Sequence, residues 1–192
     1  MTIVLSEKLL TIPEFLAMEW PDDEFDTDYE LIGGRVVARQ GITSKSHSLI
    51  VGRISTALNI FAGDFAGEKQ TGLVFPGGST NLGNPQGKHF PKPDCCFVLK
   101  ERLPADSPEI AVAPDIVIEV NSPSDTDERR VEKLQMYQQA GVVLIWSIHM
   151  LEKYVMVYQL GKTYPTLLTL ENELDGGEVL PGFKLKVSKL FE

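Results

Sequence analysis

The sequence contains little cysteine and no long hydrophobic run. Its only two cysteines are adjacent, as Cys95 and Cys96. Neighbouring residues of a strand point to opposite faces, so this pair predicts neither a structural disulfide nor a metal site of the CxxC type. A membrane-spanning helix needs ~18–20 apolar residues, whereas apolar runs such as 142–146 have the length of a strand. The first residues, MTIVLSEKLL, place no basic segment ahead of an apolar stretch, so we expect no secretory signal, no membrane association and a cytoplasmic location.

Positive charge is also scarce. The chain has 18 lysines and arginines against 27 aspartates and glutamates, which gives a net charge of −9. This balance argues against a protein that binds DNA by coating the phosphates with a basic surface. It does not exclude an enzyme with metal ions in an acidic cleft, because bound cations reverse the local electrostatics.

Hydrophobic periodicity and turn residues predict alternating helices and strands. Helices are expected at 12–20, 46–62 and 127–140, a hairpin at 29–38 with its turn at Gly33-Gly34, and strands at 94–99, 115–120, 142–148 and 154–160, the last two paired. The helix at 127–140 is expected to start with Ser124 as its cap and to bury a stripe of Val131, Leu134, Tyr137 and Ala140. The expected inner strand at 115–120 is followed by the helix at 127–140 and by the strand at 142–148. This order of elements indicates an α/β fold with a mixed β-sheet flanked by helices.

Glu119 is the most informative position, because it lies within the apolar strand Ile116-Val117-Ile118-Glu119-Val120. A carboxylate inside such a strand costs several kcal/mol unless it is paired or binds a cation. One interpretation is a strand-end glutamate paired with a helix lysine. The other is a metal ligand or an acid–base group.

Two aspartates each follow a proline at the start of a strand, Asp94 and Asp115. A Pro-Asp pair is often no more than turn chemistry. Asp115 shares a face with Glu119 but lies roughly 13 Å away along the strand, at ~3.3 Å per residue, so the two cannot bind one ion. Asp94, on a neighbouring strand, can reach Glu119 and is the preferred partner.

Lys133 borders the apolar stripe of the helix at 127–140. A lysine in this position often only extends its stem over the core. This helix, however, follows the Glu119 strand directly, and open α/β sheets place ligands at the carboxyl ends of their strands.

The spacing of Pro93-Asp94 and Glu119-Val120-Asn121 resembles the PD-(D/E)XK motif of restriction-endonuclease-like nucleases. More closely, the chain resembles the Uma-type family of bacterial endonucleases. The matching pieces are, in order, Tyr29-Glu30-Leu31-Ile32-x-Gly34, His47, Pro93-Asp94, Pro114-Asp115-x-Val117-Ile118-Glu119-Val120-x-Ser122-Pro123-Ser124-Asp125, Lys133-x-x-x-Tyr137, Gly141-Val142-x-Leu144-x-Trp146 and Leu180-Pro181-Gly182-Phe183. The resemblance implies a restriction-endonuclease-like core at 29–185 within a single domain at 1–192, preceded by a helical and loop extension at 1–28.

The resemblance also implies a site. Asp94 and Glu119 would bind Mg²⁺ or Mn²⁺, and such ions activate water for in-line attack on a phosphodiester. In the parent motif a lysine stands two residues after the acid, where this chain has Asn121. Uma-type proteins supply it from the next helix, which here is Lys133. Glu30 would be an accessory third carboxylate or a solvent-facing hairpin residue, and His47 an accessory group or a helix cap.

The leading hypothesis is a metal-dependent endonuclease that hydrolyses DNA, with Asp94, Glu119 and Lys133 as catalytic residues. Enzymes that cut both strands are often dimers, so a homodimer is expected. Two alternatives stay open. The first is a catalytically inactive binding module with the nuclease fold, which the negative charge and Asn121 favour. The second is a protein-interaction partner, which co-purification of another chain would reveal.

Overall fold

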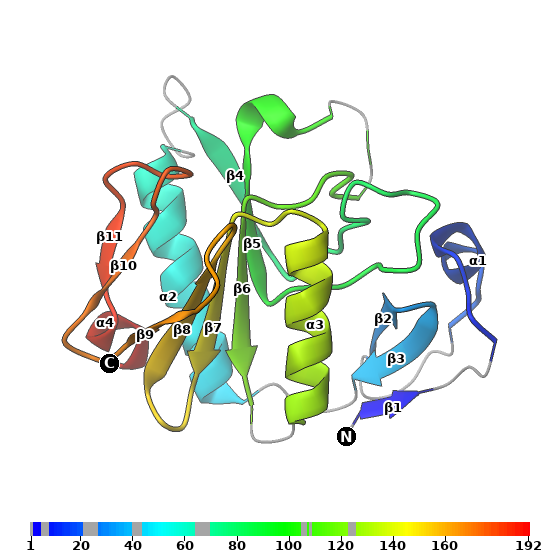
Figure 1. Ribbon diagram of the computed structural model, residues 1–192, viewed down its shortest axis with the longest axis horizontal. Helices are drawn as coiled ribbons and strands as arrows, with labels where there is room; N and C mark the ends of the chain where they lie inside the picture. Colours follow the sequence, from blue (N-terminus) through cyan, green and yellow to red (C-terminus); the bar gives the residue numbers. More distant parts are fainter. Residues whose placement is uncertain are drawn as a thin grey trace.

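A six-stranded mixed sheet forms the centre of the computed structural model, which describes residues 2–4, 8–20, 27–39, 44–63, 70–104, 107, 109–122 and 126–192 (Figure 1). The strands follow the order β4-β5-β6-β7-β8-β9. Their bounds are Gly72–Pro76 for β4, Cys95–Leu99 for β5, Ile116–Asn121 for β6, Leu144–His149 for β7, Tyr154–Gln159 for β8 and Thr166–Leu168 for β9. Only β6 and β7 pair in parallel; the other neighbours are antiparallel. The predicted α/β class with a mixed sheet is confirmed.

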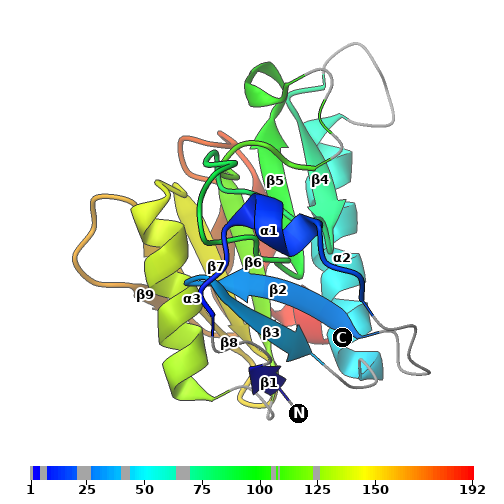
Figure 2. The same cartoon turned by 90° about the vertical axis from the view of Figure 1, so that its right-hand side faces the viewer.

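Helices cover both faces of this sheet (Figures 1 and 2). On one face α2 (Lys45–Ala62) buries Ile50, Ile54 and Leu58 in the largest apolar cluster. The C-terminal segment completes that face with β10 (Glu173–Asp175), β11 (Lys184–Lys186) and α4 (Ser188–Phe191). Phe183 from this segment stacks on Trp146 of β7, with ring centroids 5.8 Å apart. This face therefore forms the main hydrophobic core.

The two cysteines lie in β5 and are both buried and free. Cys95 belongs to the cluster under α2, and Cys96 belongs to the cluster on the opposite face. The expectation that they would point apart and form no disulfide is therefore confirmed.

On the other face lies α3 (Asp127–Gln139), and its buried side differs from the predicted one. The buried residues are Lys133, Met136 and Tyr137, whereas Val131 is 50% exposed. The predicted stripe is right at Tyr137 and wrong at Val131, and it left at the border the buried Lys133. The predicted cap was also wrong: Thr126 is the N-cap and accepts a hydrogen bond from the backbone N–H of Arg129, while Ser124 lies outside the described residues.

The N-terminal segments pack beside α3. β2 (Asp28–Ile32) and β3 (Arg35–Arg39) form the predicted hairpin, whose glycines Gly33 and Gly34 have φ of 57° and 81°. Positive φ at both turn positions is the geometry that glycine permits. β1 (Thr2–Val4) pairs with β3. α1 (Ile12–Leu16) is shorter than the predicted 12–20, and Phe15 packs against Phe90. A 3₁₀ turn, η1 (Lys100–Arg102), follows β5.

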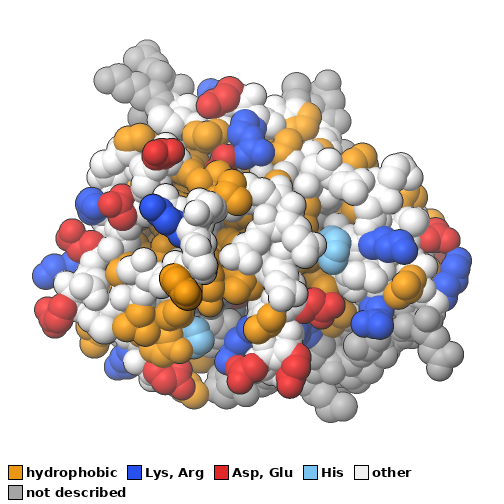
Figure 3. All heavy atoms as spheres, viewed as in Figure 1, with side chains coloured by type: hydrophobic (Ala, Val, Ile, Leu, Met, Phe, Trp, Pro, Cys, Tyr) orange, Lys and Arg blue, Asp and Glu red, His pale blue; other side chains and the backbone are white. Residues whose placement is uncertain are grey.

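Several element ends meet at one end of the sheet. β6 ends there, α2 and α3 begin near that end, and the hairpin lies on the other side of α3 (Figure 1). On the face that Figure 3 shows, basic side chains are interspersed with acidic ones. Within the described part of the chain, no helix is both long and apolar enough to cross a bilayer.

Candidate active site

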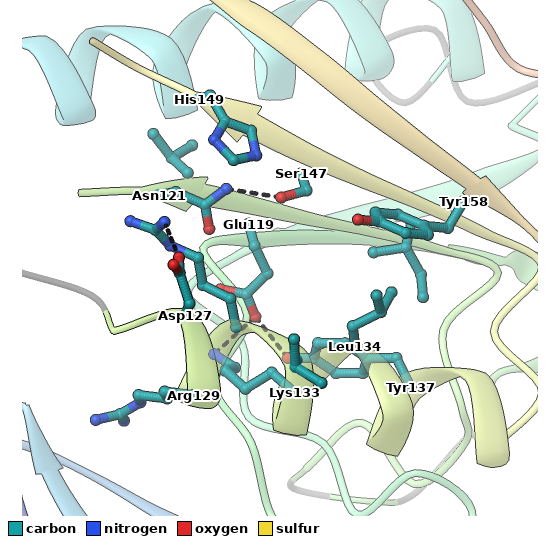
Figure 4. A pocket seen from close by; sticks show the side chains of 14 residues that line it. Glu119, Asn121, Asp127, Arg129, Lys133, Leu134, Tyr137, Ser147, His149 and Tyr158 are labelled. Atoms are coloured by element: carbon teal, nitrogen blue, oxygen red, sulfur yellow. Dashed lines mark hydrogen bonds and ion pairs between the residues drawn. The ribbon is translucent and has the colours of Figure 1, made fainter. Parts of the chain in front are cut away.

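Lys133 connects two carboxylates from distant parts of the chain. Its ammonium nitrogen Nζ lies 2.7 Å from Oε1 of Glu119 and 3.1 Å from Oε1 of Glu30. Figure 4 shows the lysine side chain of α3 directed toward Glu119 on β6. The lysine side chain is only 9% exposed, so these contacts form largely out of water, where electrostatic interactions are strong.

Glu30 is fully buried, and the interpretation of a solvent-facing hairpin residue is wrong. Its carboxylate accepts hydrogen bonds from the backbone N–H of Lys92 at 2.8 Å, from Nη2 of Arg129 at 3.1 Å and from Nζ of Lys133 at 3.1 Å. A buried carboxylate is tolerated only with such partners. Glu30 therefore fixes two cationic side chains of α3, those of Arg129 and Lys133, against the hairpin.

Tyr137 orients the carboxylate of Glu119. Its hydroxyl donates to Oε1 of Glu119 at 2.6 Å. Burial, together with the negative charges of Glu119 and Glu30, raises the pKa of Tyr137 well above its ordinary value. The phenol therefore stays protonated and remains a donor to the carboxylate.

Asp94 lies at the mouth of β5. β5 and β6 are antiparallel, and their last registered pair at this end is Cys95 with Ile118. The next position along each strand therefore brings Asp94 opposite Glu119. Oδ2 of Asp94 accepts from the backbone N–H of Val120 at 2.7 Å, and Oδ1 lies 3.2 Å from Nε2 of His47 in the first turn of α2. Asp94 thus occupies the same end of the sheet as Glu119.

The competing aspartate is engaged at the opposite end of β6. Asp115 accepts from the backbone N–H of Leu99 at 2.8 Å and pairs with Arg102. These contacts give Asp115 a structural role, and the distance along the strand separates it from Glu119.

Asn121 stands where the parent motif has a lysine, and its side chain is uncharged. Its Nδ2 donates to Oγ of Ser147 on β7 at 2.6 Å. Asn121 and Glu119 both line a cavity of about 230 Å³ between the sheet and α3, together with Lys133 and Tyr158 (Figure 4). Asp94 and His47 line a second cavity, of about 400 Å³, beside the start of α2.

The donor set fits a hard divalent ion. Asp94 and Glu119 provide carboxylate oxygens from adjacent strands, and their side chains are 7% and 15% exposed. The two carboxylates line neighbouring parts of this end of the sheet, Glu119 the cavity beside α3 and Asp94 the one beside α2, and Lys133 already offsets the charge of Glu119. Within the described ranges no three His, Cys, Asp or Glu side chains form a ready metal cluster. Mg²⁺ commonly binds through only one or two carboxylates, with water and phosphate oxygens completing its shell.

Sequence reasoning missed two residues of this site. Arg129, Lys133 and Tyr137 are spaced four apart on α3, so helical periodicity could have placed Arg129 beside the other two. Ser147 faces Glu119 through the parallel register of β6 and β7. No local pattern in the sequence reveals that register.

The comparisons with known proteins agree with this architecture. A crystal structure described as "a putative nuclease belonging to DUF820 from Anabaena variabilis ATCC 29413" matches with a TM-score of 0.78 and 20% sequence identity. The match covers 95% of this chain and 97% of that chain, and it establishes the shared fold. None of the curated proteins searched matches the chain.

The family comparison covers most of the chain. The model of the Uma2 family, described as "Putative restriction endonuclease", matches residues 12–188. Together with the shared fold, this match supports a nuclease function in general and agrees with the resemblance seen in the sequence. The chain belongs to the Uma2 family.

Proposed function

We propose that this protein is a divalent-metal-dependent endonuclease that hydrolyses phosphodiester bonds in DNA. The family assignment supports a nuclease, and restriction-endonuclease-like enzymes generally use divalent metals. Asp94 and Glu119 would hold Mg²⁺ or Mn²⁺, and Lys133 would act beside them.

The contact between Lys133 and Glu119 is the observation that carries this proposal. A strand lysine is missing because position 121 is asparagine, yet α3 brings an ammonium group within 2.7 Å of the strand carboxylate. This contact brings the lysine and one of the two carboxylates together, although they come from different elements, and it supports the proposal.

Each residue has a role that follows from its contacts. When bound, the ion would activate water and stabilise the leaving oxygen. Lys133 would offset the negative charge that develops on the phosphate, because a fixed cation in a site with little water does so without reorganisation. Tyr137 and Glu30 hold Glu119 and Lys133 in place. The backbone N–H of Val120 holds Asp94 through Oδ2, and His47 lies beside its other oxygen, Oδ1.

Nicking of supercoiled plasmid DNA with Mg²⁺ or Mn²⁺ tests the proposal. We expect Asp94→Asn and Glu119→Gln to abolish nicking, and Lys133→Met to slow it about 10²–10³-fold, the usual cost of losing one group that stabilises the transition state. The matched controls are Asp175→Asn and Lys184→Met, which break an exposed carboxylate–lysine pair far along the chain. The proposal is wrong if the three site variants, folded by circular dichroism, nick as fast as the controls.

Metal binding separates this proposal from a catalytically inactive module. Calorimetry with Mn²⁺ should show binding that Asp94→Asn and Glu119→Gln remove. Absence of any carboxylate-dependent binding would favour the module. Nucleases that cut both strands are often dimers, so the proposal includes a homodimer, which sedimentation at the concentration of the nicking assay would detect.

A further inference from the structure

The imidazole of His47 has no ordinary structural role for its two nitrogens. Nδ1 and Nε2 are both buried, and neither has a hydrogen-bond partner among the described residues. A buried polar atom that is left unpaired destabilises the folded protein. Such an atom in a folded protein calls for a reason, and an absent ion is one of the few that apply.

The position of Nε2 supplies that reason. It lies 3.2 Å from Oδ1 of Asp94, within ion-pair range, but its N–H geometry does not make a hydrogen bond to that oxygen. Two neighbouring ligands in an octahedral shell with bonds of 2.0–2.1 Å are separated by about 3 Å. The separation of the two atoms is therefore the one that two ligands of a single ion would have.

The surroundings leave room for such an ion. His47 and Asp94 line the same cavity of about 400 Å³, and the backbone N–H of Val120 holds Asp94 through its other oxygen, Oδ2. His47 is fixed on the first turn of α2, where Ser44 caps the helix by accepting from the His47 backbone N–H at 3.2 Å. The carboxylate of Asp94 is thus held by a backbone N–H, and the helix cap fixes the backbone that carries His47.

We propose that His47 is a nitrogen ligand of the divalent ion, next to Asp94, and that it makes the centre prefer Mn²⁺ over Mg²⁺. This rests on the metal-dependent activity proposed above, and it decides between the two ions. Mg²⁺ favours oxygen ligands almost exclusively, whereas imidazole binds transition-metal ions well. One nitrogen in a shell otherwise made of carboxylate, water and phosphate oxygens therefore favours Mn²⁺.

The chain contains only three histidines, so a nitrogen signal from a bound metal ion can be assigned by substituting them one at a time. His89 already accepts a hydrogen bond at Nδ1 from the backbone N–H of Gly33, at 3.1 Å. His149 lines the other cavity. The measurement is pulsed electron paramagnetic resonance of Mn²⁺ added to the full chain, without DNA, in which a directly bound ¹⁴N modulates the spin echo.

We expect nitrogen modulation in the wild type and in the control His149→Gln, and its loss in His47→Gln. In calorimetry, loss of a group that supports a metal commonly weakens binding by roughly 10–100-fold, so His47→Gln should weaken Mn²⁺ binding at least about tenfold and Mg²⁺ binding much less. His47→Asp should restore Mn²⁺ binding without nitrogen modulation, which shows that the site is intact in that variant.

Two results overturn the inference. Mn²⁺ that binds without nitrogen modulation, or with modulation that persists in His47→Gln, removes His47 from the centre and leaves the proposed nuclease function standing. Absence of Mn²⁺ binding to the wild type removes both the nitrogen ligand and the metal dependence of the proposed function.

Discussion

Replacing Glu30 by glutamine should destabilise the protein more than any exposed charge substitution. The carboxylate is fully buried and accepts from three donors, two of which are the cationic groups of Arg129 and Lys133. Glutamine keeps the shape but removes the negative charge and turns an NH₂ group toward cations. Arg129 and Lys133 are only 14% and 9% exposed, so they would lose compensation that water cannot replace.

The expected magnitude follows from this burial. Breaking a buried ion pair by removing one partner costs about 3–5 kcal/mol. Lys133 keeps its contact with Glu119, so we expect the lower end, about 3 kcal/mol, for Glu30→Gln. For a chain of this size 1 kcal/mol corresponds to roughly 2–4 °C, so Tm should fall by about 6–12 °C.

Urea and thermal unfolding followed by circular dichroism measure this change. Asp175→Asn is the matched control: its pair with Lys184 is exposed, and such pairs contribute about 0–1 kcal/mol. A double-mutant cycle of Glu30→Gln with Lys133→Met should show a coupling of about 0.5–3 kcal/mol. If Glu30→Gln changes the free energy of unfolding by less than about 0.5 kcal/mol, the buried network does not stabilise the fold as argued.

Three further predictions concern single side chains. Tyr137→Phe removes the hydroxyl that donates to Glu119 at 2.6 Å and should cost about 1–3 kcal/mol in urea unfolding, the penalty of an unmade buried hydrogen bond; an unchanged midpoint would contradict that contact. Burial raises the pKa of the Cys95 thiol to about 11 and the pKa of the Cys96 thiol well above its ordinary value. A thiol reagent at pH 8 should therefore label neither cysteine until the chain unfolds, and fast labelling of the native protein would disprove their burial. Burial, followed by the charge of Arg130, lowers the pKa of His149 below 6.5. The neutral imidazole therefore contributes its full stability above that pH, and this contribution is lost as the pH falls through the folded-state pKa. The free energy of unfolding should fall less steeply from pH 7 to 5 in His149→Gln than in the wild type, and equal slopes would refute this.

Local patterns predicted most of the fold. The Gly33-Gly34 turn, the apolar strand around Glu119 and the helix at 46–62 all depend on residues close in sequence, and they form β2–β3, β6 and α2. The buried face of α3 could not be predicted in this way. Lys133 is buried because Glu30 comes from a hairpin about a hundred positions earlier, and periodicity treats every lysine as a surface residue.

For the candidate site too, local motifs predicted some of the residues, and tertiary packing determines the contacts of the others. The ordered motifs selected Asp94, Glu119 and Lys133, and the structure brings the lysine to the glutamate. Their catalytic roles stay predictions. The position of His47 relative to Asp94 depends on how α2 docks on the sheet, and the partner of Asn121 depends on the register between β6 and β7. Docking and register come from tertiary packing, which one sequence does not display.

Moving the lysine from position 133 on α3 to position 121 on β6 tests whether DNA nicking requires only a positive charge near the carboxylates or requires the lysine of α3 itself. Positions 119 and 121 are two apart on β6, so their side chains share a face, and both line the 230 Å³ cavity that Lys133 also lines. In a Lys133→Met background, where plasmid nicking should be slow, adding Asn121→Lys should recover about tenfold or more of the lost rate, because a cation offsets the developing charge from either side. Asn121→Met in the same background is the control, since it also removes the hydrogen bond to Ser147 but brings no charge. If both double variants are folded and nick equally slowly, the exact contact of Lys133 with Glu119 and Glu30, rather than a positive charge near the carboxylates, is what the chemistry requires.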